Sequence, residues 1–511
     1  MTEPVATPPH GARRTGSGGR PVRGPGAAAA RSLVLGLLAL PLAAAAAAAQ
    51  EAPAADPEAV VVASRARAAG LLLQIAGLQQ AEALLPEAEE SLRRALALEP
   101  EPEAAFALGR LLLRRGADDE AGAVFASLLD WSGGRAELRV LVGGAYADAG
   151  RPGEAIREFE AAIAADPGLA RAHASLGVAY LALTAGQSNP EAERALRRAL
   201  ALDPDSYEAN YSLGQLELLD GRRRKASEHL LAAAAARPRS PDPWLQLGLD
   251  AFTRGETGEA ETTLSKGLAL ADREPGGSAD LLRRACAALT RLALERGDRA
   301  AAARWFERYR SLDEPDPSPG PGTSPAAETA PAGRRRALAE RLAGVYNDWG
   351  TAEARRGDYA EALARYREAE RWHPDAPGLA RNLGLAAFQS RDYAESARAL
   401  ARTVEAEPGD RAARALLAIS LASSERWAEA AEVFAAIGDA AFADPRLAFL
   451  WARSLARAGR PEEARRVLAR MRELPLPPEA LAQIAALYQE IGDRETATEL
   501  EAEAARGPAG P

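Results

Sequence analysis

The chain is poor in the residues that catalytic and metal sites need. Its 511 residues include one cysteine, Cys286, and four histidines, none of which lies at ligand spacing from another. A single cysteine excludes an intramolecular disulfide and a cysteine-based metal site. The sequence also lacks a phosphate-binding loop, a dinucleotide-binding glycine turn and a nucleophile elbow. We therefore expect no enzymatic activity, no cofactor and no metal.

Aromatic residues and lysine are scarce as well. Aromatic residues make up 5% of the chain, and Lys225 and Lys266 are its two lysines. The hydrophobic content of 47% therefore reflects a chain rich in alanine, whose high helix propensity favours an all-α protein. The formal net charge is −9. Because binding to nucleic acid needs a basic surface, this balance argues against nucleic acid as a partner.

Long apolar runs are absent except near the N-terminus. Residues 1–31 are basic and rich in proline and glycine, and residues 32–49 are apolar. Ala47 and Ala49 fit the small-residue rule for signal cleavage. We therefore expect an exported, periplasmic protein that is cleaved near Ala49. One alternative is an uncleaved segment that anchors the chain in the inner membrane, and another is an alanine-rich disordered tail. Residues 50–65 are expected to link this region to the body.

A motif that recurs about every 34 residues organises the body of the chain. A small residue, usually glycine, lies in an apolar helix, and an alanine follows about twelve residues later. Phe or Leu comes next, and Asp-Pro or Glu-Pro ends the unit. One copy consists of Gly143, Tyr146, Ala155, Phe159, Ala162 and Pro167. A single unit cannot bury its own apolar face, so successive units must stack on one another.

Each motif residue has a structural role in this interpretation. The glycine lets the two helices of a pair approach closely, because it has no side chain at their crossing. Phe or Leu and the second alanine fill the contact between neighbouring pairs. Proline ends the second helix, because it cannot continue the helical hydrogen-bonding pattern. The motif therefore predicts an all-α solenoid of helix-turn-helix repeats.

The repeats fall into two blocks. Residues 66–312 hold about seven units and residues 334–506 about five, by the period of the motif. Residues 313–333 contain six prolines together with Gly, Ser and Thr. This composition is typical of a flexible or extended linker, or of a long loop inside one array.

The motif resembles the tetratricopeptide repeat over nearly all of residues 69–502. This resemblance implies a right-handed solenoid with a concave groove. The first helix of each pair would line this groove, which would bind a peptide segment or a partner protein. Counting from the motif predicts the following groove residues: Tyr211, Gln215, Leu245, Leu249, Phe252, Asn347, Arg381, Phe388 and Gln389. The alternative for Leu245, Leu249 and Phe252 is packing between adjacent repeats.

Two specialised forms of the family fit poorly. A clamp for C-terminal carboxylates uses lysine, which is nearly absent, and asparagines at one repeated position. Asn210, Asn347 and Asn382 do not recur at one motif position, and this also argues against the asparagine ladder of the glycosyltransferase members.

The sequence therefore predicts a non-catalytic scaffold for protein-protein interaction in a bacterial cell envelope. It would contact the membrane if residues 32–49 stay uncleaved. Two alternatives remain, namely a self-associating structural repeat protein and an accessory subunit of an envelope glycan or polysaccharide enzyme complex.

Overall fold

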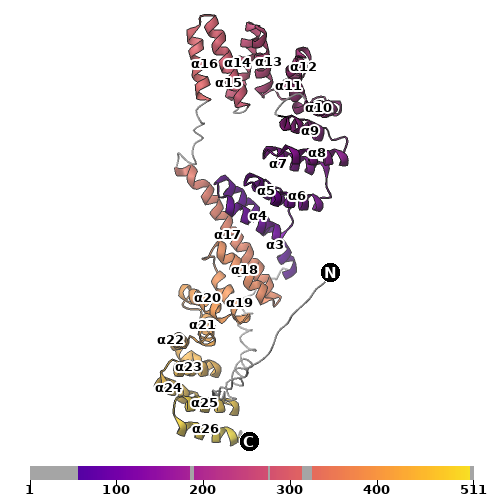
Figure 1. Ribbon diagram of the computed structural model, residues 1–511. Helices are drawn as coiled ribbons and strands as arrows, with labels where there is room; N and C mark the ends of the chain where they lie inside the picture. Colours follow the sequence, from indigo (N-terminus) through magenta and orange to yellow (C-terminus); the bar gives the residue numbers. More distant parts are fainter. Residues whose placement is uncertain (1–55, 185–188, 274–276, 313–324, 507–511) are drawn as a thin grey trace, which may run out of the picture. The chain divides into compact units, whose positions relative to one another are not determined.

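The computed structural model describes residues 56–184, 189–273, 277–312 and 325–506. These residues form successive helical hairpins, and no β-strand occurs among them (Figure 1). The helices of the first repeat block are α3 (Pro57–Ala81), α4 (Leu85–Leu98), α5 (Pro102–Arg114), α6 (Asp118–Trp131), α7 (Ala136–Asp148), α8 (Pro152–Ala165), α9 (Ala170–Leu183), α10 (Pro190–Leu202), α11 (Tyr207–Leu219), α12 (Arg223–Ala236), α13 (Asp242–Arg254), α14 (Thr257–Arg273), α15 (Ala279–Glu295) and α16 (Arg299–Ser311). Those of the second are α17 (Pro325–Arg355), α18 (Tyr359–Trp372), α19 (Leu379–Gln389), α20 (Tyr393–Ala406), α21 (Arg411–Ser423), α22 (Trp427–Ile437), the 3₁₀ helix η1 (Gly438–Ala443), α23 (Pro445–Arg457), α24 (Pro461–Met471), α25 (Pro478–Glu490) and α26 (Arg494–Arg506). The all-α repeat solenoid expected from the sequence is confirmed.

A residue in the left-handed conformation joins the two helices of most pairs. Gly150 follows α7 with a φ of 73°. Glycine adopts this conformation at no steric cost, whereas a side chain makes it unfavourable. The same conformation occurs at Gly116, Gly221, Gly255, Gly297, Gly357, Gly459 and Gly492. Three corresponding turns carry Ala83, Arg391 and Glu425 instead. These turns therefore hold backbone strain that the glycine turns avoid.

A glycine lies where the two helices of a pair cross, as the sequence predicts. In the pair α7–α8, a Cβ atom added to Gly143 would lie 2.5 Å from the ring of Phe159. In this pair the ring therefore occupies the place that a side chain at position 143 would fill. The same arrangement pairs Gly109, Gly177, Gly214, Gly248, Gly350 and Gly384 with Phe125, Leu196, Leu230, Leu264, Tyr366 and Leu400, respectively. We call these the crossing glycines. The Phe or Leu of the motif thus fills the crossing within its own pair, whereas the sequence pattern had suggested the contact between pairs.

The described chain packs as two compact units. One comprises Pro57–Thr403, and the other comprises the described part of Val404–Pro511. The largest apolar core of the first unit combines residues of both repeat blocks, from Leu72 and Ile75 in α3 to Leu342 and Tyr346 in α17. In the second unit, Leu468, Ile484 and Tyr488 belong to a separate core.

Helix α17 packs against α3, at the start of the first block. The Arg335 guanidinium forms an ion pair with Glu82 over 3.1 Å. Ion pairs also join Arg94 to Glu368 and Arg371 to Glu90, between α4 and α18. The second block therefore begins on the first helix of the first block, although α16 precedes it in sequence. The first unit therefore holds described residues from both repeat blocks, and it ends inside α20.

Two helices begin earlier than the sequence pattern indicates. Helix α3 begins at Pro57 instead of near residue 66, and α17 begins at Pro325 instead of after residue 333. Most of 325–333 is alanine, glutamate or threonine, and Pro325 occupies a first-turn position that favours proline. The expected N-terminal segments 1–31 and 32–49, and residues 313–324 of the expected linker, lie outside the described residues. Among those described, α3 alone has the length and composition to cross a membrane, and part of it is buried in the core.

Candidate partner-binding face

Three successive first helices present leucine or valine to solvent. Leu141 of α7 is 43% exposed, Val178 of α9 is 41% exposed and Leu219 of α11 is 66% exposed. Leu141 lies two residues before the crossing glycine of its helix. Val178 lies one residue after the crossing glycine of its helix, and Leu219 lies five residues after that of its own. Because these offsets differ by three and four residues, the three side chains occupy one side of the repeated helix. We call Leu141, Val178 and Leu219 the first-helix face.

Tyr211 and Gln215 extend this side of α11. Both are half-buried, and the Gln215 side-chain amide donates a hydrogen bond to the Tyr211 hydroxyl over 3.1 Å. The Tyr211 ring stacks on Tyr207 with 5.7 Å between ring centroids. Burial raises the pKa of Tyr211 well above its ordinary value, so the hydroxyl stays neutral and can donate to an incoming acceptor. The structure thus brings these two sequence-predicted residues together.

The predicted residues of α13 lie in a different environment. Leu245 is fully buried and Leu249 is 7% exposed, and both belong to an apolar cluster with Leu264 and Leu289. Their environment matches the alternative interpretation, in which they pack between adjacent repeats. Phe252 is half-buried against the same cluster. The Arg291 guanidinium lies 5.8 Å from the centre of its ring.

The predicted residues of the second block come from α17 and α19. The Asn382 amide donates a hydrogen bond to the Asn347 side-chain oxygen over 3.0 Å. Phe388 is half-buried and meets Tyr393 edge to face, with 5.7 Å between ring centroids. Arg381 is half-buried and Gln389 is exposed. These side chains are polar or already packed, so they offer less free apolar surface than α7, α9 and α11.

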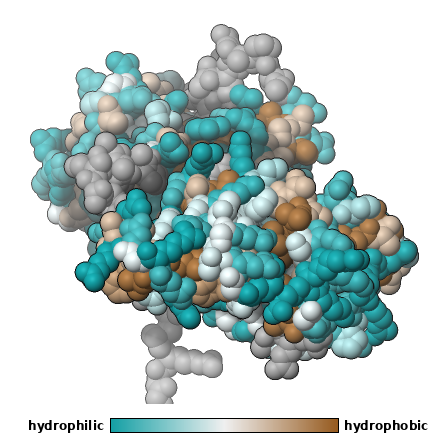
Figure 2. Space-filling view, turned by 90° about the horizontal axis from the view of Figure 1, so that it is seen from above, coloured by the Kyte–Doolittle hydropathy of each residue, from teal (hydrophilic) through white to brown (hydrophobic). Residues whose placement is uncertain are grey.

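Sequence reasoning missed the three most exposed residues of this surface. On α11, Leu219 is exposed, whereas the predicted residues Tyr211 and Gln215 are half-buried. The sequence contained a pattern that could have identified the exposed residues, because Leu141 and Val178 are apolar residues at solvent-exposed positions of the repeat. Among the described residues, the large exposed hydrophobic ones all lie between Val62 and Phe306. Figure 2 shows hydrophobic side chains gathered between hydrophilic ones on the face in view.

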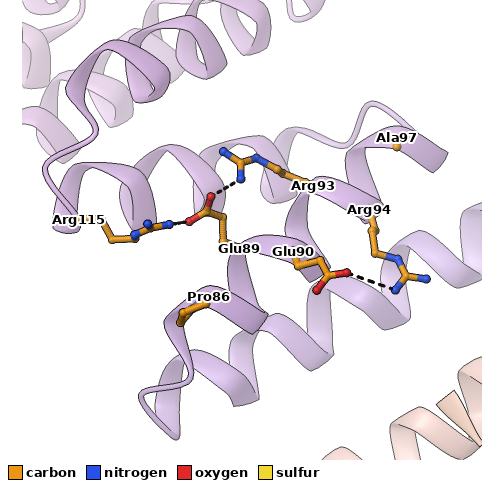
Figure 3. Close-up of a pocket in the computed structure, with 7 residues that line it drawn as sticks. All are labelled: Pro86, Glu89, Glu90, Arg93, Arg94, Ala97 and Arg115. Atoms are coloured by element: carbon orange, nitrogen blue, oxygen red, sulfur yellow. Dashed lines mark hydrogen bonds and ion pairs between the residues drawn. The ribbon is translucent and has the colours of Figure 1, made fainter. Parts of the chain in front are cut away.

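A separate hollow of about 330 Å³ lies on α4, beside the end of α5. Its lining residues are Pro86, Glu89, Glu90, Arg93, Arg94, Ala97 and Arg115 (Figure 3). The buried Glu89 carboxylate forms ion pairs with Arg93 and Arg115, and Arg94 pairs with Glu90 and Glu368. These charges already satisfy one another, so the hollow offers a ligand no unpaired group among its described acids and bases.

The described residues offer no candidate metal centre. No group of three or more histidine, cysteine, aspartate and glutamate side chains occurs among them in a ligating arrangement. Cys286 is buried, and burial raises the pKa of its thiol. A thiol of raised pKa holds less of the reactive thiolate.

Comparison with known sequences identifies the repeats. Sequence models of the tetratricopeptide repeat match residues 79–135, 143–188, 181–241 and 354–420. The matched residues include crossing glycines and the left-handed turns that follow them. These segments of the chain are tetratricopeptide repeats, and such repeats support a role as a scaffold for protein interaction. No curated protein matches the chain.

Several solved structures are similar to part of the chain. MamA from Desulfovibrio magneticus is 23% identical, with 34% of this chain and 96% of that chain covered and a TM-score of 0.27. PilF from Pseudomonas aeruginosa is 17% identical, with 50% and 94% covered and a TM-score of 0.30. A tetratricopeptide repeat protein from Parabacteroides merdae is 17% identical, with 63% and 99% covered and a TM-score of 0.27.

Proposed function

We propose that the chain is a non-catalytic scaffold that binds a segment of a partner protein on its first-helix face. The observation that carries this proposal is the exposure of Leu141, Val178 and Leu219 on three consecutive first helices. Each is large, apolar and 41% to 66% exposed, although the helices around them bury most of their apolar residues. Exposed apolar residues that repeat along one face are typical of an interaction site.

The spacing of the helices limits the kind of segment that fits. Packed helices lie about 8–10 Å apart, so contacts with three consecutive first helices span about 20 Å. A segment of about six residues in extended conformation has this length. A helix of about thirteen residues has it as well. Tyr211 and Gln215 add a hydroxyl and an amide beside Leu219, which suits a segment with apolar anchors and free backbone groups.

We further propose that the protein works in a bacterial cell envelope. The support is the sequence of residues 32–49, an apolar run that follows a basic segment and precedes a small-residue cleavage signal. Export with cleavage near Ala49 would release the repeats into the periplasm. An uncleaved run would hold them at the inner membrane.

The test is an in-cell crosslink followed by affinity capture, performed on separated soluble-envelope and membrane fractions. The wild type should capture one or two proteins in stoichiometric amounts, and the L141E/V178E/L219E variant should lose them. A matched control is Leu231→Glu, because Leu231 is also 46% exposed but lies on α12, a second helix. Capture that survives the triple variant would contradict the proposed face. N-terminal sequencing of the bait tests cleavage near Ala49.

A further inference from the structure

The last pair of the first block lacks the crossing glycine. Thr290 of α15 occupies the position that glycine holds in the five preceding pairs, seven residues before the left-handed Gly297. Its hydroxyl donates a hydrogen bond to the Cys286 carbonyl over 2.8 Å, within the same helix. A single Cβ atom at Gly143 would already lie 2.5 Å from Phe159. The full threonine side chain therefore leaves no room for a ring at this crossing.

Phe306 of α16 is accordingly on the surface. It corresponds in the motif to Phe159 and Leu264, which are 2% and 0% exposed, whereas Phe306 is 54% exposed. Its ring stacks almost parallel on Tyr309, with 6.3 Å between centroids and an angle of 8°. Ala302 is the one fully buried residue of α16. An exposed aromatic ring on a helix with so little buried surface is a ready anchor for another helix.

Arginine surrounds this ring. Helix α16 carries four arginines and one glutamate, in a chain whose formal net charge is −9. Arg308 turns back to bind Asp272 over 2.7 Å. Arg299, Arg304 and Arg310 are exposed, and none of these three side chains forms a hydrogen bond or ion pair with the described residues. Arg310 lies four residues after Phe306 and Arg299 lies seven before it, so both share its side of the helix.

The position of α16 at the end of its array adds to this argument. At the other end of the array, α17 covers α3, with the Arg335–Glu82 ion pair between them. Among the described elements, α16 packs against α15 and reaches α14 through Arg308. Terminal repeats usually carry a polar outer face, and on α16 the exposed Phe306 interrupts that polar face, so the helix can accept a further helix there.

We propose that the surface formed by Phe306, Arg299 and Arg310, here called the α16 face, docks an acidic amphipathic helix of a partner protein. The partner's apolar side would cover Phe306, and its carboxylates would pair with the two arginines. A second copy of α16 fits less well, because four arginines would face four arginines. This site is distinct from the first-helix face, so it extends the proposed function to a second point of contact.

The test measures binding of a labelled peptide to the full chain by fluorescence anisotropy. The probe is a designed helix of about 18 residues, long enough to be helical in water, with leucine along one side and glutamate along the other. It should bind saturably to the wild type. Phe306→Ser should weaken binding at least about tenfold, as loss of a hot-spot aromatic does. The R299E/R310E variant should do the same, and a peptide with lysine in place of glutamate should not bind.

Two control variants distinguish the α16 face from the rest of the exposed apolar surface. Leu231→Ser removes an exposed leucine of α12, and Leu219→Ser alters the first-helix face, so both should leave peptide binding unchanged. Because Phe306 is exposed, Phe306→Ser should also keep the wild-type thermal unfolding curve. Absence of saturable binding to the wild type, equal binding of the lysine peptide, or equal binding to the Phe306 variant would each overturn the proposal. A wild-type dimer that Phe306→Ser abolishes would overturn it too, because a second copy would then occupy the face.

Discussion

The crossing of α7 with α8 and the crossing of α15 with α16 use the same motif with opposite results. Gly143 leaves space into which Phe159 inserts, and that ring is 2% exposed. Thr290 fills the corresponding space, and Phe306 is 54% exposed. In both pairs the aromatic residue lies four residues after the alanine of the motif. In these two pairs the residue at the crossing on the first helix therefore differs together with the exposure of the aromatic residue on the second helix.

The largest expected effect is at the crossing of α13 with α14. A Cβ atom at Gly248 would lie 2.6 Å from the Leu264 side chain and 2.9 Å from its backbone nitrogen. A side chain can move but the backbone resists, so Gly248→Leu should lower the free energy of unfolding by about 3 kcal/mol, the upper end for overpacking. Chemical denaturation measures this change. An unchanged midpoint would show that the crossing tolerates a side chain.

In the pair α17–α18, the pH dependence of the free energy of unfolding reports the burial of the tyrosine ring at the crossing. Tyr366 lies against Gly350, and burial raises the pKa of Tyr366 from 10.0 to about 12. The folded state thus keeps this proton to higher pH than the unfolded chain does. The resulting stability is fully present below pH 10 and is lost as the pH rises toward 12, by up to about 2.7 kcal/mol. Tyr366→Phe removes this group.

The measurement is the free energy of unfolding at pH 9 and at pH 11, for the wild type and for Tyr366→Phe. The wild type should lose more stability between these two values than the variant does. The variant also lacks the hydrogen bond between the Tyr366 and Thr351 hydroxyls, 3.1 Å long, but that loss is similar at both pH values. Equal pH dependence in the two proteins would contradict burial of the ring at the crossing.

Two adjacent glycines in α7 provide a matched comparison. A Cβ atom at Gly143 would collide with Phe159, whereas one at Gly144 would have no atom within 4 Å. Gly143→Ala should therefore destabilise the protein by about 1–2 kcal/mol. Gly144→Ala should stabilise it by up to about 1 kcal/mol, because alanine has the higher helix propensity. Thermal unfolding of both variants measures the difference, and shifts in the same direction would refute the crossing argument.

The smallest expected effect on stability comes from giving the crossing of α15 with α16 the glycine that the crossing of α7 with α8 has. Thr290→Gly should open the space at α15 and let Phe306 insert. Phe306 is already partly buried, so burial of its exposed half contributes about 1.5 kcal/mol. Glycine in the helix costs about half a kcal/mol relative to threonine, so the net gain is about 1 kcal/mol. Hydroxyl-radical footprinting of Phe306 measures its exposure directly. A ring that stays exposed would show that Thr290 does not control its position.

The sequence predicted the helical pairs because their determinants are local and repeat in register. Gly143, Ala155 and Phe159 recur at fixed spacing, and so do the glycines of the turns. The packing of α17 on α3 was not predictable, because it joins residues far apart in the chain, such as Glu82 and Arg335. No local pattern records which distant helix a helix will cover.

The candidate site was only partly predictable, for a related reason. The repeat position alone predicted Tyr211 and Gln215 as groove residues, and the structure brings their side chains into hydrogen-bond contact. Leu245 occupies the same motif position as Tyr211 but is fully buried, because neighbouring repeats pack over it. The exposure of a groove position thus depends on the side chains of the next repeat, which the motif does not specify.

Site-specific photocrosslinking in intact cells tests the central claim most directly. A photoreactive amino acid would replace Val178 on the first-helix face in one variant and Leu231 on α12 in another. The two positions are similarly exposed, at 41% and 46%. We expect position 178 to yield a discrete crosslinked protein that position 231 does not yield. The same crosslinked products at both positions, or products at position 231 alone, would contradict binding on the first-helix face.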